Sequence, residues 1–218
     1  MRIIWLALVT ISVFWNASQA LADQVPTIKG SVVPTASEQR FVSAMQADLG
    51  RRFPTATAAE AAGYFRYTNE DNTGAISYAN LHWASKDVHH PSQLWYSKDG
   101  TLLGADYSVL NVTNMRPHQW GIQSGRWYEF DDHIHYVTKD RRTGSRRYDQ
   151  YVDPISDYIK AGGDPKHPDA AILVKMHRVT STSDVVRIFD FPAIWDLIVW
   201  VKPNPAGAFA EKNPDVKR

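Results

Sequence analysis

The chain has 218 residues, with 24 Lys and Arg against 23 Asp and Glu, so its formal net charge is +1. This near-neutral balance gives no overall electrostatic attraction to nucleic acid or to an anionic membrane, and no nucleic-acid partner is expected. Cysteine is absent, which excludes disulfides, thiolate catalysis and iron–sulfur clusters in this chain. Any metal site must therefore use His, Asp, Glu, Met or backbone oxygen.

The N-terminus has the three parts of a secretory signal peptide. Arg2 precedes an uncharged apolar run, and Ala20 and Ala22 form the small-residue pattern that a signal peptidase recognises. The run is short for a membrane span, and no other stretch is long and apolar enough to cross a bilayer. We therefore expect residues 1–22 to be removed. The mature protein would be exported to the periplasm or the extracellular medium, with no stable membrane insertion after cleavage.

The first part of the mature chain is predicted to be helical. Residues 23–34, which contain Pro and Gly, are expected to form an extended leader. Apolar residues at helical spacing predict helices over 35–49 and over 55–65, and Thr35 with Glu38 three residues later is typical of a helix start. Together these two segments would form a helical hairpin.

The rest of the chain is predicted to consist mainly of strands. Alternation over 75–84 predicts a half-buried strand on which Tyr78, Asn80 and His82 share one face. The elements expected after it are a hairpin over 93–107 with an Asp-Gly turn, a structured loop over 111–127, a strand over 133–138, a basic solvated turn over 139–147, short helices over 154–161 and 170–176, and strands over 185–191 and 194–201. Helices followed mainly by consecutive strands are typical of an α+β fold. We predict an N-terminal helical hairpin followed by a mainly antiparallel sheet, in a single compact domain over residues 35–218.

Histidine supplies the clearest candidate for chemistry. His133 and His135 are two residues apart on a predicted strand, so they project from the same face. Two imidazoles on one face can chelate Zn, Cu, Ni or Fe. His82 and His90 would join this site if their segment lies beside the strand that carries His133. We expect a metal or small polar ligand, with no more than one transition-metal ion and no nucleotide cofactor, because no dinucleotide or phosphate-loop motif is present.

Carboxylates supply the candidate polar partners of this site. Asp131 and Asp132 directly precede His133, and Asp196 interrupts an apolar strand. An unpaired buried charge costs several kcal/mol, so Asp196 is expected to have a partner, and Arg187 on the preceding strand is the natural one. The preferred interpretation of this pair is structural, and the alternative is an acid, a base or a ligand clamp.

Three classes of function remain open from the sequence. The preferred one is a non-catalytic, exported binding protein that holds a metal or a small polar ligand with its histidines. The second is a metalloenzyme that uses the same histidines with a carboxylate as general base. The third is a homo-oligomeric interaction or assembly protein whose aromatic residues form a subunit interface.

Overall fold

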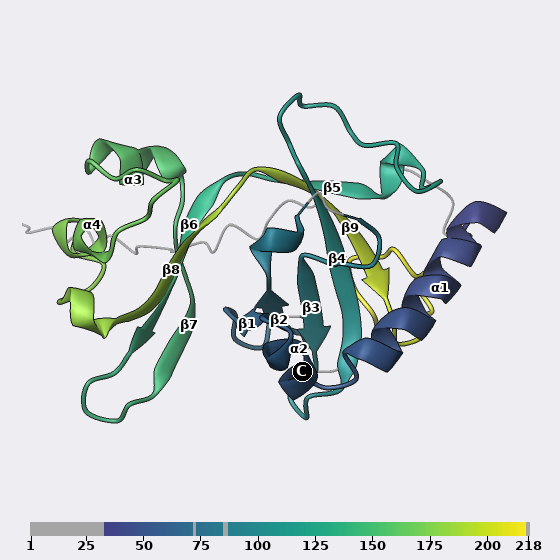
Figure 1. Cartoon of the computed structure of the whole chain (residues 1–218), viewed down its shortest axis with the longest axis horizontal. Helices are drawn as coiled ribbons and strands as arrows, with labels where there is room; N and C mark the ends of the chain where they lie inside the picture. The colour runs from purple at the N-terminus through teal and green to yellow at the C-terminus, as the bar shows by residue number, and fades with distance from the viewer. Residues whose placement is uncertain (1–32, 72, 85–86, 217–218) are drawn as a thin grey trace, which may run out of the picture.

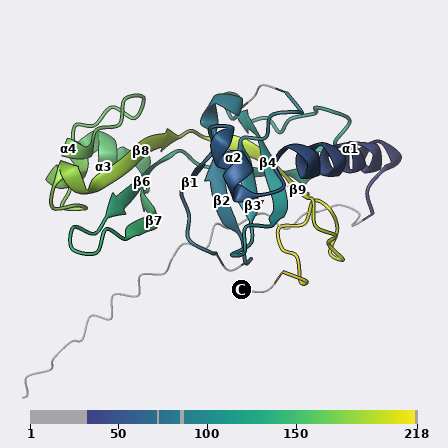
Figure 2. The same ribbon diagram turned by 60° about the horizontal axis from the view of Figure 1, so that its bottom comes forward.

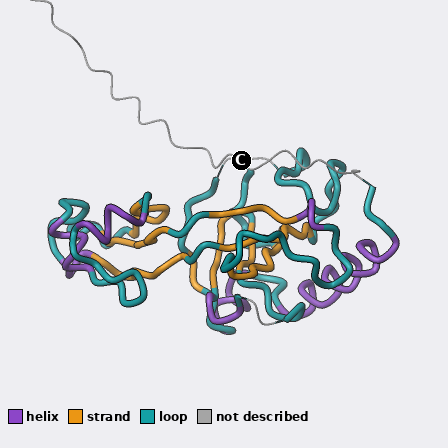
Figure 3. The backbone as a smooth tube through the Cα atoms, turned by 90° about the horizontal axis from the view of Figure 1, so that it is seen from above, coloured by secondary structure: helices purple, strands orange, loops and turns teal. Residues whose placement is uncertain are grey.

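The computed structural model describes residues 33–71, 73–84 and 87–216. The predicted signal peptide and nearly all of the predicted leader lie outside these residues. The described chain combines a few helices with two antiparallel sheets, which confirms the predicted α+β class. Figures 1 and 3 show the two sheets side by side along the long axis of the molecule. None of the described helices is long and apolar enough to cross a membrane.

The larger sheet has six strands in the order β1-β2-β3-β4-β9-β5, and the smaller sheet has three in the order β7-β6-β8. The strands are β1 (Phe65–Arg66), β2 (Ile76–Ala79), β3 (Gln93–Tyr96), β4 (Leu102–Leu110), β5 (Trp127–Phe130), β6 (His133–Lys139), β7 (Arg146–Val152), β8 (Val185–Phe191) and β9 (Ile194–Trp200). The helices are α1 (Ala36–Arg52), α2 (Ala56–Ala61), α3 (Ile155–Lys160) and α4 (Ala170–Lys175), with short 3₁₀ turns at Leu81–Trp83, Ser124–Arg126 and Thr182–Asp184.

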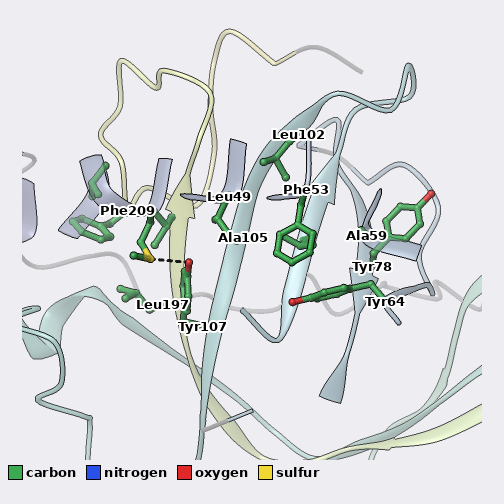
Figure 4. Close-up of a cluster of buried hydrophobic side chains, with 14 of the residues drawn as sticks. Leu49, Phe53, Ala59, Tyr64, Tyr78, Leu102, Ala105, Tyr107, Leu197 and Phe209 are labelled. Carbon is green, nitrogen blue, oxygen red and sulfur yellow. Dashed lines mark hydrogen bonds between the residues drawn. The ribbon is translucent and has the colours of Figure 1, made fainter. Parts of the chain in front are cut away.

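One face of the large sheet packs against α1, which crosses it in Figures 1 and 2. Helix α1 begins at a capping box, in which Thr35 and Glu38 satisfy each other's backbone N–H groups. Its buried apolar side chains meet those of β4 and β9, and Figure 4 shows Leu49, Tyr107 and Leu197 within this cluster. Burying each such side chain stabilises the fold by about 1.5–3 kcal/mol, so this face supplies much of the core.

The buried pair Glu38 and Arg126 fixes the start of α1 against the segment before β5. Arg126 Nε lies 3.1 Å from Glu38 Oε1, and both side chains are almost completely buried. Burial opposes ionisation of Glu38, but the hydrogen bonds from Arg126 and from backbone N–H groups outweigh it and lower the pKa of Glu38. The helix is therefore held by a paired charge as well as by apolar contacts.

The small sheet also has one covered face. Helices α3 and α4 pack on the side that carries Ile134, Tyr136 and Val152, and they add the fully buried side chains of Tyr158 and Leu173. Figure 1 shows both helices on the outer side of this sheet. The opposite face, which carries His133 and His135, turns towards the large sheet at its inner end.

The structure has two sheets where a single sheet was predicted. The chain passes from one sheet to the other twice. Strand β5 ends at Phe130 and β6 begins at His133, while β8 ends at Phe191 and β9 begins at Ile194. Pro192 has no backbone N–H and cannot continue a ladder, which favours the change of sheet at this point.

The segment around His82 differs from the prediction. Strand β2 ends at Ala79, and Leu81–Trp83 form a 3₁₀ turn closed by a hydrogen bond of 3.0 Å from the Trp83 N–H to the Asn80 carbonyl. Both faces of β2 are buried, so the alternating sequence pattern does not correspond to one buried and one solvated face. The predicted second helix is also shorter, because α2 ends at Ala61 and the chain then forms β1.

Candidate functional site

His133 and His135 lie on the same face of β6, as predicted, with ring centroids 4.7 Å apart. The register of β6 with β8 places Phe191 beside His133 and Phe189 beside His135. Each imidazole stacks on its neighbour, with centroid distances of 4.7 Å for His133 and Phe191 and 5.4 Å for His135 and Phe189. Tyr151 of β7 is the register partner of His135 on the other side. The two rings are thus held by flanking aromatic side chains.

Tyr67, which directly follows β1 of the large sheet, closes the inner side of this arrangement. The Tyr67 ring lies edge-on to His135, 5.0 Å between centroids, and also contacts Phe189 and Phe191. The Asp149 N–H donates to the Tyr67 carbonyl at 2.9 Å, which ties the two sheets together. We call the six residues of this arrangement the junction cluster: Tyr67, His133, His135, Tyr151, Phe189 and Phe191.

The ring nitrogens of the two histidines have different partners. His133 Nδ1 lies 2.9 Å from the carbonyl oxygen of Asp131. A carbonyl only accepts hydrogen bonds, so Nδ1 carries the proton and the neutral ring keeps its lone pair on Nε2. Nδ1 of His135 is buried and has no hydrogen-bond partner among the described residues. An unsatisfied buried polar group costs about 1–3 kcal/mol, and no described residue offsets this cost for His135 Nδ1.

His135 is neutral at physiological pH. Burial is the main cause, and with the neighbouring His133 it lowers the pKa of His135 to about 3, against the opposing effect of a backbone hydrogen bond at Gln150. A neutral imidazole is the form that donates a lone pair to a metal or accepts a hydrogen bond from a ligand.

The carboxylates next to the histidines do not complete a cluster. Asp131 contributes its backbone carbonyl to His133. Asp132 lies close enough to Asp190 to affect its titration: burial, and then the charge of Asp132, raise the pKa of Asp190 to about 6. Asp190 is paired with Ile134, which places it on the helix-covered face, opposite to the histidines.

His82 and His90 do not join the pair. His82 belongs to the 3₁₀ turn after β2. His90 stacks on Trp83, with centroids 4.1 Å apart, and its Nδ1 lies 2.8 Å from Asp87 Oδ1. Over residues 33–71, 73–84 and 87–216 no group of three or more His, Asp or Glu side chains is arranged to hold a metal ion. The four histidines proposed from the sequence therefore do not form one site.

A buried acidic network in the large sheet was only partly predicted. Asp196 Oδ1 accepts a hydrogen bond from the Ser108 hydroxyl, and its Oδ2 accepts one from Gln93 Nε2 at 3.1 Å. Asp106, on the same sheet face, accepts a bond of 2.9 Å from Trp95 Nε1, while its Oδ1 is buried and has no partner within the described part of the chain. The signal for Asp106 was present in the sequence, because it also interrupts an apolar strand.

This network favours protonated carboxyls and reaches the junction cluster. Burial raises the pKa of Asp196 to about 7, against the hydrogen bonds from Ser108 and Gln93. Burial, and then the charge of Asp196, also raise the pKa of Asp106 well above its usual range. The Tyr67 hydroxyl donates to Gln93 Oε1, so the same tyrosine touches both His135 and the network.

The predicted pair of Arg187 and Asp196 is wrong. The two residues lie on β8 and β9, which belong to different sheets. The Arg187 guanidinium lies over the Phe65 ring, with Cζ 3.9 Å from the centroid. Arg187 and Asp196 are close in the sequence, but the change of sheet at Pro192 separates them.

Comparison of the chain with models of protein families, with curated proteins and with solved structures finds no match to any of them. The functional argument therefore rests on the residues and their geometry.

Proposed function

We propose that the protein is a non-catalytic binding protein that holds one transition-metal ion, of the Zn, Cu, Ni or Fe group, through His133 and His135. The observation that carries the proposal is the pair of stacked imidazoles on one strand face, 4.7 Å apart between centroids. The proposal includes export, as the signal peptide predicted over residues 1–22 implies.

The hydrogen bonding of His133 supports metal binding. Histidines that bind metals commonly donate their second ring N–H to a carbonyl or a carboxylate, which fixes the tautomer and the ring orientation. The Asp131 carbonyl occupies this position for His133. Stacking on Phe191 and Phe189 restrains both rings further. Little rotational freedom is then lost when a metal binds.

The proposed site has two protein ligands, so the remaining coordination positions would be taken by water or by a small polar ligand. Transition metals of this group accept imidazole together with oxygen ligands. No observation favours the enzyme alternative in particular, because Asp132 and Asp190 lie together near the other face and Asp196 is held within the large sheet. We therefore propose binding of a metal with an exchangeable ligand as the function.

The test is metal binding by untagged protein. Elemental analysis of protein purified without chelators, followed by calorimetric titration with Zn²⁺, Cu²⁺ and Ni²⁺, should give about one equivalent of metal. His133→Ala and His135→Ala should each weaken binding by tenfold or more, about 1.4 kcal/mol, because a chelate loses one of its two ligands.

His118→Ala and His90→Ala are the matched controls. His118 is exposed on the loop between β4 and β5, and His90 stacks on Trp83. Neither substitution should change the affinity. Loss of binding in His90→Ala would show that His90 is a ligand, as in the four-histidine site expected from the sequence. Unchanged affinity in both His133→Ala and His135→Ala would refute the proposed two-histidine site.

A further inference from the structure

The outer end of the histidine-bearing face of the small sheet carries three cationic side chains. Lys139 of β6 is paired with Arg146 of β7, and Val137 of β6 is paired with Arg187 of β8. Residues at alternate positions of β6 share a face, so Lys139, Arg146 and Arg187 all project from the same side as His135. All three are exposed. We call these three residues the cationic patch.

This arrangement has an energetic cost within the chain. Like charges directly opposite each other on neighbouring strands are destabilising. Burial, together with the charge of Arg146, lowers the pKa of Arg187, and no carboxylate contributes to that change. The cationic side chains are therefore close enough to repel one another.

The nearby carboxylates are engaged elsewhere. Asp184 pairs with Arg141, and Asp140 accepts hydrogen bonds from the backbone N–H groups of Arg142 and Thr143. None of the ion pairs formed within the described part of the chain includes a residue of the cationic patch. The ion pairs of residues 33–71, 73–84 and 87–216 therefore do not neutralise the patch.

Arg187 is also held in place. Its Cζ lies 3.9 Å from the centroid of the Phe65 ring, which comes from the large sheet. A guanidinium stacked on a ring keeps its in-plane N–H donors for a carboxylate or phosphate, and less freedom is lost when that anion binds.

We propose that Lys139, Arg146 and Arg187 form a binding site for a multivalent oxyanion, a small ligand with two or more phosphate or carboxylate groups. Strands lie about 4.8 Å apart and rise about 3.3 Å per residue. The arginines of β7 and β8 are two strands and two residues apart, so they start about 12 Å apart. A ligand that meets both arginines therefore carries more than one anionic group. The site does not depend on metal at the junction cluster.

Inorganic pyrophosphate is the probe for a first test. The full chain, stripped of metal and then dialysed free of chelator, is titrated with pyrophosphate and with phosphate at low and at high NaCl. Pyrophosphate should bind more tightly than phosphate, and its affinity should fall as salt rises, because exposed charges are screened. Absence of pyrophosphate binding by the folded protein at low salt would overturn the proposal.

Substitutions then locate the site. Arg146→Gln and Arg187→Gln should each weaken pyrophosphate binding by about tenfold, the effect of losing one charge-assisted contact. Arg142→Gln, on the exposed turn between β6 and β7, removes the same charge outside the patch and should change the affinity by about twofold or less. An equal loss in all three variants would mean that pyrophosphate responds only to overall charge, which would also overturn the proposal.

Discussion

The large sheet buries carboxyl groups that accept hydrogen bonds, whereas the small sheet carries exposed cationic side chains outside the described ion pairs. Asp196 in the large sheet accepts hydrogen bonds from Ser108 and Gln93, and Glu38 is paired with Arg126. In the small sheet the cationic patch is exposed and outside every described ion pair. We therefore expect buried polar interactions to contribute more to stability in the large sheet, and exposed groups suited to binding to lie on the small one.

The strongest test of this comparison uses one ion pair from each region. Arg126→Met leaves Glu38 buried without its partner and should lower the free energy of unfolding by about 3–5 kcal/mol. Arg141→Met breaks the pair with Asp184 beside the small sheet, in which the arginine is exposed and the carboxylate is buried. Thr180 still donates to Asp184 in this variant, so the loss should be much smaller than in Arg126→Met. Chemical denaturation of both variants measures the difference. Equal losses would show that the two regions do not differ in this way.

Apolar side chains give the next test. Leu197 in the large sheet and Leu173 on α4 are both fully buried. Each Leu→Ala substitution should cost about 2–5 kcal/mol, because it removes apolar contact and leaves a cavity. We expect one unfolding transition in both variants, since Phe191 and Ile194 join the sheets through a shared buried cluster. A second transition in Leu173→Ala alone would show that the small sheet unfolds separately, and that the predicted single domain is two units.

A third test concerns the pH dependence that the buried acidic network gives to the large sheet. The pKa of Asp196 rises from 3.8 to about 7 on folding. A carboxyl whose pKa is raised on folding contributes stability below its unfolded pKa, and this contribution is lost as the pH rises through the folded value. The contribution of Asp196 to stability should therefore fall between about pH 4 and pH 7.

Asp196→Asn removes this titration, so the stability of the variant relative to the wild type, measured by denaturation, should increase between about pH 4 and pH 7. The variant keeps a group of the same shape that can bond to Ser108. Ser108→Ala is the control, because it removes a hydrogen bond to Asp196 but leaves the carboxyl in place. An unchanged slope in Asp196→Asn would show that Asp196 is ionised in the folded protein.

Much of the strand content could be predicted from local patterns. The hairpin of β3 and β4 follows from its Asp-Gly turn, where Gly100 has a φ of +83°. Strands β8 and β9 follow from runs of β-branched and aromatic residues. Strand β5 was missed because its four residues lie at the end of a segment rich in Pro and Gly. Strand β2 ends at Ala79, and the 3₁₀ turn at Leu81–Trp83 that follows interrupts the predicted strand.

The sequence predicts only the part of the site that depends on neighbouring residues of a single strand. The shared face of His133 and His135 follows from the two-residue period of a strand. The expected convergence of His82 with them required a strand pairing that does not form. Tyr67 was not singled out, because its role depends on contact between two sheets. Asp196 was recognised as unusual, but its partners come from β3 and β4 and could not be identified from neighbouring sequence.

The two passages between the sheets have a consequence for how the chain is built. Phe130 is paired with Ile194 and His133 with Phe191, so residues 133–191 leave and re-enter the large sheet at the same place. The small sheet is thus an insert within a hairpin formed by β5 and β9. Strand β9 lies between β4 and β5. During synthesis the ribosome must complete the whole insert before the large sheet can receive the strand that joins its two parts.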